Sequence, residues 1–227
     1  MKIKFLVICL FLVSNSMLAQ VGNENVSFST GNFFLRGNRP TTKEYVVDGN
    51  PYIDGAEFHN VKINGYSKNV QDLRYNAYED EMEFIKNDVI YYANKEDGLK
   101  VNFPKLKKIY QCLNYSYDNK NRFGYLVLLI ENPKLSLYKR EKIELLKGEK
   151  SPNAYSKDAN DYYAKEKDLY LVKKEDKFFK LSKNIKDFIA YFSLENNEVA
   201  DFYKKNKLNF SKEEDLIKLF NFINSKN

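Results

Sequence analysis

Phe123-Gly124-Tyr125-Leu126-Val127-Leu128-Leu129-Ile130 is the most apolar stretch of this 227-residue chain after its first twenty residues. A polar turn, Asp118 to Arg122, comes directly before it. The run is short for a helix and contains aromatic and β-branched residues, so it indicates a strand buried on both faces. A buried helix is the alternative that the same run leaves open. We therefore expect this segment to be a central strand of a β-sheet.

Patterns with a period of two surround this strand, from about residue 45 to residue 181. Leu99-Lys100-Val101-Asn102-Phe103 alternates cleanly between apolar and polar side chains, and Asn64-Gly65 and Asp97-Gly98 are turn signals. Because short connections make consecutive strands antiparallel neighbours, we expect a meander of roughly nine or ten strands. Such a meander has to curl, into either a barrel-like or a two-layered sheet. The polar residues 149–165 are predicted to form the longest loop.

From residue 182 onward the apolar residues follow a helical period. Ser182 is predicted to cap a first helix with an apolar stripe from Ile185 to Phe192, and a second helix is expected over residues 196–205. Ser211 and Glu214 stand three residues apart, which predicts a capping box for a third helix. Helices this short need tertiary contacts, so we expect them to pack on the sheet. The predicted fold class is mainly β (β+α), an antiparallel meander with C-terminal helices.

The N-terminus has the layout of a secretory signal peptide. Lys2 and Lys4 precede an unbroken apolar run from Phe5 to Val13, and Ala19 suits the position before a cleavage site. The run is too short to cross a bilayer as a helix. The predicted organisation is a signal peptide at 1–19, a loosely ordered leader at 20–44, an antiparallel β region at 45–181 and a helical region at 182–227.

Charge and cysteine content restrict the function classes. Removal of the predicted signal peptide leaves 35 basic and 31 acidic residues, a net charge of +4, spread along the chain. Lys outnumbers Arg by 32 to 5 in the full chain, whereas nucleic-acid binding usually needs a concentrated basic stripe with arginines. Cys112 becomes the only cysteine, so no internal disulfide forms, and its apolar neighbours predict a buried thiol. We expect no nucleic-acid partner and no transmembrane segment in the mature chain.

Most catalytic constellations are missing from the sequence. His59 is the only histidine, and its neighbours offer no acid for a Ser-His-Asp, Cys-His or zinc site. No glycine-rich phosphate-binding loop is present. The sequence therefore predicts no cofactor, no metal site and no enzymatic activity.

An acidic cluster and two nearby tyrosines form the candidate binding surface: Tyr75, Tyr78, Asp80, Glu81 and Glu83. Paired carboxylates can hydrolyse a glycoside, and exposed tyrosines beside polar groups can bind a glycan or a protein. Strand alternation predicts that Met82 and Phe84 point inward and that Glu81 and Glu83 face water. We therefore expect a solvent-facing surface and not a catalytic pair.

Several segments together resemble an uncharacterised family of exported proteins of Bacteroidetes. They are Gly49-Asn50-Pro51-Tyr52, Leu73-Arg74-Tyr75-Asn76-Ala77-Tyr78, Glu79-Asp80-Glu81-Met82-Glu83-Phe84, Asn206-Lys207-Leu208 and Glu213-Glu214-Asp215-Leu216-Ile217. The end of the signal peptide, Leu18-Ala19-Gln20, is similar to signal peptides of that phylum. The resemblance spans roughly residues 49–223. It implies a periplasmic or outer-membrane-associated location, or secretion, and carries no known activity.

The leading hypothesis is an exported, non-enzymatic β-rich domain that binds a protein or an envelope component. A periplasmic carrier of a lipid or another apolar ligand is the alternative, because a curled sheet closed by amphipathic helices can enclose a cavity. A weaker alternative is a hydrolase, which requires two of Asp80, Glu81 and Glu83 to converge in a cleft with shifted pKa values. An empty cavity favours the carrier, and a filled core favours the binding domain.

Overall fold

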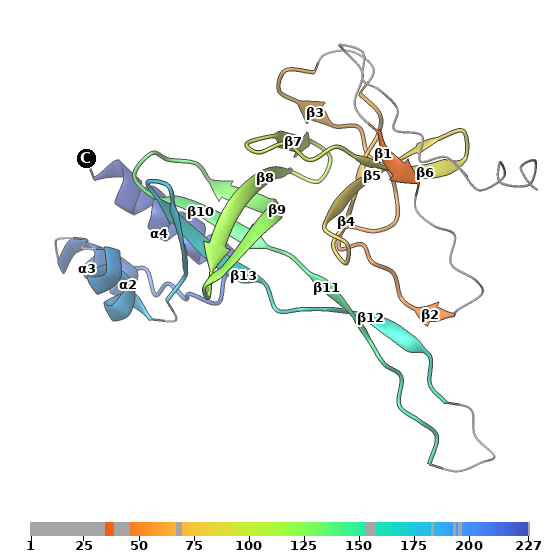
Figure 1. Cartoon of the computed structure of the whole chain (residues 1–227). Helices are drawn as coiled ribbons and strands as arrows, with labels where there is room; N and C mark the ends of the chain where they lie inside the picture. The colour runs from red at the N-terminus through yellow and green to blue at the C-terminus, as the bar shows by residue number, and fades with distance from the viewer. Residues whose placement is uncertain are drawn as a thin grey trace, which may run out of the picture.

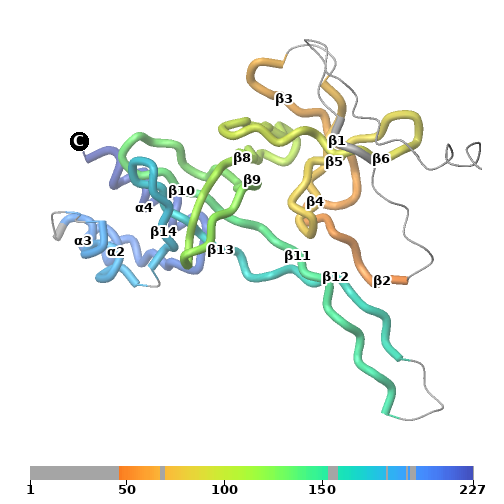
Figure 2. Tube along the Cα trace, in the orientation of Figure 1, coloured from red at the N-terminus to blue at the C-terminus, as the bar shows by residue number. Residues whose placement is uncertain are grey.

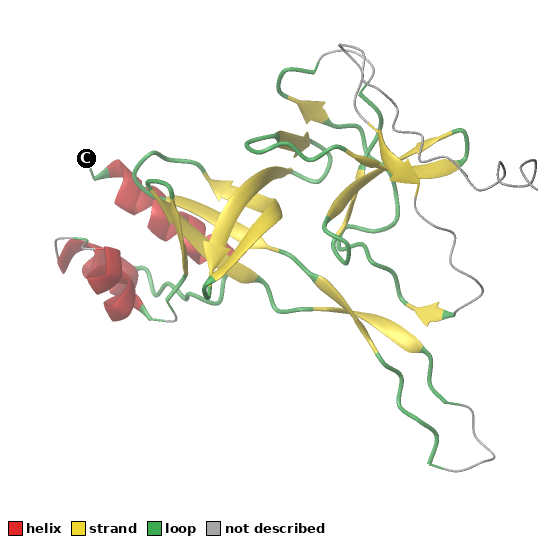
Figure 3. Ribbon diagram, viewed as in Figure 1, coloured by secondary structure: helices red, strands yellow, loops and turns green. Residues whose placement is uncertain are grey.

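The computed structural model describes residues 35–38, 46–66, 70–152, 158–182, 184–192, 194 and 197–226. The predicted signal peptide and most of the predicted leader lie outside these residues. Figure 3 shows a mainly β fold with antiparallel sheets and three helices toward the C-terminus, as the sequence predicts.

The largest sheet has seven strands in the order β14-β13-β10-β9-β8-β7-β3, and all neighbours are antiparallel. Its strands are β3 (Lys62–Ile63), β7 (Lys100–Phe103), β8 (Lys108–Tyr117), β9 (Lys120–Ile130), β10 (Ser136–Arg140), β13 (Leu169–Lys174) and β14 (Lys177–Lys180). The apolar run at 123–130 lies in β9, the central strand, and Tyr125 to Val127 are buried. The strand prediction is confirmed, and the helix alternative is wrong.

Two smaller sheets complete the β region. One has the order β1-β6-β5-β4 and the other the order β11-β12-β2. Their strands are β1 (Leu35–Asn38), β2 (Val47–Asp48), β4 (Arg74–Asn76), β5 (Glu81–Lys86), β6 (Val89–Ala93), β11 (Ile143–Leu146) and β12 (Asp161–Lys165). In Figures 1 and 2, β11 and β12 form a long ribbon that leaves the large sheet after β10 and returns to it at β13.

This ribbon corrects the end of the loop predicted at residues 149–165, because Asp161–Lys165 form β12, whereas residues 149–152 and 158–160 are loop. Tyr162 and Tyr163 in β12 pair with Leu146 and Leu145 in β11. The strand is missed because its surroundings are polar and the ribbon is half-buried, so the apolar alternation is weak. β12 also pairs in parallel with β2, which a simple meander does not contain.

The large sheet curls but does not close into a barrel. β14 approaches β8, and the rings of Tyr115 and Phe178 lie 5.9 Å apart across the gap. The described strands form no hydrogen-bonded ladder between β8 and β14. Barrel-like closure, one of the two predicted outcomes, is therefore not observed in the described part of the chain.

Three apolar clusters hold the sheets and helices together. The first lies between the β4-β5-β6 sheet and one end of the large sheet, and it includes Leu73, Phe84 and Tyr110. The second joins the large sheet to the helices, and the third lies inside the curl. Cys112 belongs to the first cluster, where burial raises the pKa of its thiol to about 12. The predicted buried thiol is confirmed.

The helices α2 (Ile185–Phe192), α3 (Asn197–Lys205) and α4 (Glu213–Ser225) pack on the large sheet as predicted. Phe188 and Phe220 are fully buried there, beside Leu137 of β10 and Val172 of β13. No helix formed by the described residues has the length and apolar character needed to cross a membrane.

Both predicted helix caps are wrong. The N–H of Asp187 donates to Oδ1 of Asn184 at 2.9 Å, so Asn184 and not Ser182 caps α2. Lys212 precedes α4 without any side-chain cap, and the Ser211–Glu214 capping box does not form. Instead, Asn209 accepts from the N–H of Ser211 at 2.8 Å and donates its own N–H to Asp215 at 3.1 Å. The Asn209 side chain therefore forms an Asx turn. This turn takes up the backbone N–H of Ser211, which the Glu214 carboxylate would accept in a capping box.

Candidate functional site

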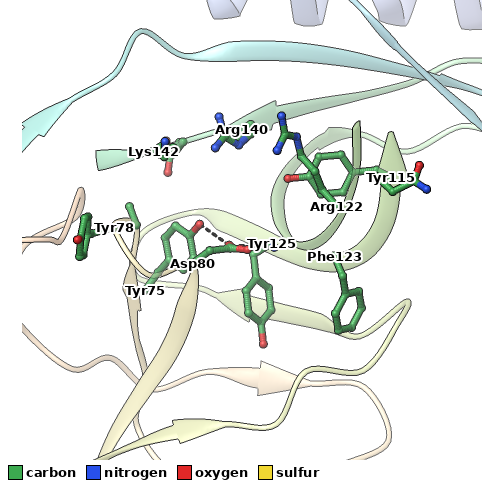
Figure 4. Close-up of a pocket in the computed structure, with 12 residues that line it drawn as sticks. Tyr75, Tyr78, Asp80, Tyr115, Arg122, Phe123, Tyr125, Arg140 and Lys142 are labelled. Atoms are coloured by element: carbon green, nitrogen blue, oxygen red, sulfur yellow. Dashed lines mark hydrogen bonds between the residues drawn. The ribbon is translucent and has the colours of Figure 1, made fainter. Parts of the chain in front are cut away.

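A cavity of about 300 Å³ lies where the turn between β4 and β5 meets β9 and the β10–β11 connection. Figure 4 shows its cationic side chains along one side, facing Tyr75 and Asp80. The cavity is lined by Tyr75, Ala77, Tyr78, Asp80, Tyr115, Asn121, Arg122, Phe123, Tyr125, Arg140, Glu141 and Lys142.

Asp80 is fixed in place on the first wall. It occupies the β4–β5 turn with a φ of 58°, a left-handed conformation that aspartate tolerates. Its Oδ1 accepts from the Tyr75 hydroxyl at 2.8 Å and from the backbone N–H of Tyr125 at 3.1 Å. Lys95 Nζ lies 3.4 Å from its Oδ2. Burial raises the pKa of Asp80 above its usual value, although Lys95 and the two hydrogen bonds oppose this shift.

The opposite wall carries positive charge. Lys142 is paired with Glu166 at 2.7 Å and with Glu144 at 3.0 Å. Arg140 reaches Glu166 only at 3.9 Å. The guanidinium of Arg122 stacks over the Tyr117 ring at 4.4 Å, and its buried Nε has no hydrogen-bond partner among the described residues. The two guanidinium groups are therefore the cations of the cavity with the weakest internal compensation.

Glu141, which also lines the cavity, is held by a buried charge network. Its carboxylate lies 2.9 Å from Lys139 Nζ and 3.1 Å from Lys108 Nζ, and it accepts from the Tyr110 hydroxyl at 2.9 Å. Lys139 also pairs with Glu213 of α4 at 2.8 Å. Burial alone would raise the pKa of Glu141, but Lys108 and Lys139 outweigh burial and hold it below the usual value. This carboxylate is thus fully engaged with protein groups.

We expect this network to make stability depend on pH. Because the pKa of Glu141 is lowered in the folded state, its stabilisation is present above the unfolded value, about 4.3, and is lost as pH falls through the folded pKa. Glu141→Gln should lower the free energy of unfolding by about 1.5 kcal/mol at pH 7. Urea titrations should show this difference shrinking between about pH 5 and about pH 3. A difference that does not change over this range would contradict the role of the charge.

The structure brings together three of the five predicted site residues. Tyr75, Tyr78 and Asp80 line the cavity. Glu81 and Glu83 do not, and they do not face water as predicted, because both are buried. Met82 and Phe84 point inward as predicted.

The error over the two glutamates has a physical cause. Residues 51–58 fold over β4 and β5 at Arg74 and Glu83, so this part of the sheet does not face water. Arg74 lies between the rings of Tyr52 and Phe58, at 4.0 and 4.3 Å from the ring centres. Glu83 pairs with Arg74 at 2.7 Å, and Glu81 lies 3.4 Å from Lys95. Both glutamates are therefore structural counter-ions.

Sequence reasoning missed the cationic wall, which is made by Arg122, Arg140 and Lys142. A signal was available, because arginine is rare in this lysine-rich chain. Of the three arginines whose side chains the structure describes, one neutralises Glu83 and the other two line the cavity. Guanidinium groups bind carboxylates and phosphates through parallel hydrogen bonds, which a lysine cannot do.

The arrangement suits the binding of an anion. Asp80 is the single residue of the predicted acidic cluster in the cavity, so two of Asp80, Glu81 and Glu83 do not converge there as the hydrolase hypothesis requires. The other carboxylate that lines the cavity, Glu141, is paired with Lys108 and Lys139. No group of three or more His, Cys, Asp or Glu side chains within the described ranges is placed to hold a metal ion. A comparison of the chain with protein-family models, curated proteins and solved structures finds no match.

Proposed function

We propose that the protein is an exported, non-enzymatic binding domain, and that its cavity recognises an anionic group on a protein or envelope component. The observation that carries this proposal is a pair of guanidinium groups in one cavity. The buried Nε of Arg122 has no hydrogen-bond partner among the described residues, and Arg140 reaches a carboxylate, that of Glu166, only at 3.9 Å. The basic and apolar first nineteen residues support the exported location.

The neighbouring acids leave this positive charge available. Glu141 is paired with Lys108 and Lys139, which also pair with Asp54 and Glu213, and Asp80 is held by Lys95 and two hydrogen bonds. A ligand carboxylate or phosphate would meet both guanidinium groups in a half-buried place, where charge-assisted hydrogen bonds are stronger than at an open surface.

The same lining argues against an apolar ligand. A cavity of about 300 Å³ is present, as the carrier hypothesis requires, but charged groups and tyrosine hydroxyls line it. The apolar space beside it is filled, since the rings of Tyr75 and Tyr110 lie 4.6 Å apart and those of Tyr75 and Tyr125 lie 6.0 Å apart. These features support a polar binding site over a lipid carrier.

An NMR titration with inorganic phosphate and with acetate tests the proposal. We expect saturable shifts of the backbone amides around Arg122 and Tyr125. Each of Arg122→Gln and Arg140→Gln should weaken binding roughly tenfold to a hundredfold, because each removes a charge-assisted hydrogen bond of about 1.5–3 kcal/mol.

Lys120→Gln is the matched control, because Lys120 is an exposed cation on the same strand as Arg122 and does not line the cavity. It should leave the affinity unchanged. Equal weakening in this control and in the arginine variants would mean that general surface charge attracts the anion, and the proposal would then be wrong.

A further inference from the structure

A second cavity, of about 280 Å³, adjoins the first. It is lined by Asn114, Tyr115, Ser116, Asn121, Arg122, Asp176 and Phe178. Tyr115, Asn121 and Arg122 line both cavities. The two spaces therefore meet at the β8–β9 hairpin, and the second lies in the gap where β14 approaches β8 without pairing to it.

The two cavities differ in chemistry. Arg122 and Asn121 line both cavities, and the first adds the Arg140 guanidinium. The second adds the amide of Asn114, the hydroxyl of Ser116, the carboxylate of Asp176 and the ring of Phe178. Amide and hydroxyl side chains both donate and accept hydrogen bonds, as a ligand rich in hydroxyl groups requires. Tyr115 and Phe178, which are largely buried in the third apolar cluster, form the base of this cavity.

The lining of the first cavity also includes an exposed aromatic residue, Phe123. Phe123 is 44% exposed although it is a large apolar residue within β9, and it lines the cavity that contains Arg140. An exposed aromatic ring beside charged and hydroxyl groups is a feature of polar recognition surfaces and not of an apolar pocket.

We propose that the ligand is an acidic oligosaccharide that occupies both cavities. Its carboxylate or phosphate lies between Arg122 and Arg140, and the adjacent sugar ring lies in the second cavity beside Asn114, Ser116 and Asn121. The two cavities, of about 300 and 280 Å³, are near the lower end of small-ligand sites, so a ligand that occupies both has at least two rings. This inference rests on the proposed function, because it identifies the ligand class of the same site.

Calorimetry with galacturonic acid and its dimer and trimer tests the inference, with maltotriose as a neutral chain. We expect the dimer to bind at least about tenfold more tightly than the monomer, because it fills both cavities. Maltotriose should bind at least about tenfold more weakly than the acidic trimer, because it lacks the anionic group.

Variants in each cavity separate the two contributions. Arg140→Gln should weaken binding of the monomer, dimer and trimer alike. The double variant Asn114→Ala, Ser116→Ala should reduce the dimer-to-monomer affinity ratio at least about fivefold. The backbone N–H of Asn114 donates to Asp97 at 2.8 Å, and this bond does not depend on the Asn114 side chain. Lys120→Gln is again the control and should change neither affinity.

The outcomes distinguish this inference from the proposed function. If phosphate and acetate bind at the arginines but the dimer binds no more tightly than the monomer, the oligosaccharide inference is wrong. The proposed anion site is then still supported. If no anion binds, both are wrong. Equal affinities for maltotriose and the acidic trimer would show that the anionic group does not contribute to binding, and the inference would be wrong. Chromatography of the trimer after incubation would show shorter products if the protein were a hydrolase, and that result would overturn the non-enzymatic proposal.

Discussion

Glu83→Ala is expected to lower the free energy of unfolding by about 3–5 kcal/mol, the largest effect of any single substitution considered for this protein. The Glu83 side chain is fully buried, and the Arg74 side chain is 10% exposed. Removing the carboxylate leaves a buried guanidinium without its counter-ion, which costs more than the pair itself contributes.

Further contacts of Glu83 add to this effect. Its Oε1 accepts from the Asn76 amide at 2.7 Å, and its Oε2 accepts from the Tyr52 hydroxyl at 3.0 Å. Tyr52 in turn stacks on Arg74. The carboxylate therefore connects β4, β5 and the segment that covers them, and its loss should loosen this whole face.

Urea denaturation followed by circular dichroism measures the effect. Glu57→Ala is the matched control, because the Glu57 side chain is 78% exposed and its pair with Lys105 is 3.7 Å long. It should change stability by less than about 0.5 kcal/mol. The double variant Arg74→Met, Glu83→Leu should recover most of the loss, because it removes both buried charges. If the double variant is no more stable than Glu83→Ala, the unpaired charge is not the cause.

Gly124→Ala is expected to destabilise the fold by about 3 kcal/mol and to disturb the cavity. A Cβ at this position would overlap with Oδ2 of Asp80 and lie 2.9 Å from its Cγ. The aspartate has little room to yield, because Tyr75, Tyr125 and Lys95 all hold its carboxylate. Elsewhere in a strand the same change is mild or favourable, so the expected loss is specific to this contact.

A double-mutant cycle tests whether Asp80 is the cause. Asp80→Gly removes the overlapping side chain, and glycine accepts the positive φ at this position without strain. Gly124→Ala in the Asp80→Gly background should therefore cost at least about 1 kcal/mol less than in the natural protein, measured by urea denaturation. Additive effects of the two substitutions would show that the added methyl group conflicts with another part of the structure.

The sequence predicts the strands best where one face of the sheet is apolar. β9 and β7 form where an apolar run and apolar alternation predict them. β12 is missed because its partners are β11 and β2, and a polar two-stranded ribbon carries little apolar signal. The helices are predicted from their stripes, but their caps depend on whether Asn184 or Asn209 can reach a backbone group, which periodicity does not determine.

The sequence predicts the residues on only one wall of the cavity. Tyr75, Tyr78 and Asp80 are close together in the sequence, so a local cluster identifies them. Arg122 and Arg140 reach the same cavity from β9 and β10, far along the chain from that cluster. Their contribution depends on how the two sheets pack, and no local pattern encodes that packing. The prediction that Glu83 faces water is wrong for a similar reason. Strand alternation assumes that one face of the sheet is exposed to solvent, but residues 51–58 cover that face at Glu83.

The parallel pair of β2 and β12 has a consequence for the order of folding. Asn160 donates to Asp48 at 3.2 Å across a separation of 112 residues, so this edge requires closure of a very long loop. Contacts between distant segments form late, because their entropic cost precedes any gain in energy. If the chain enters a new compartment with its N-terminus first, β2 arrives long before its partner. Until β12 has also been transported, β2 remains an unpaired strand that chaperones can bind or that can pair incorrectly.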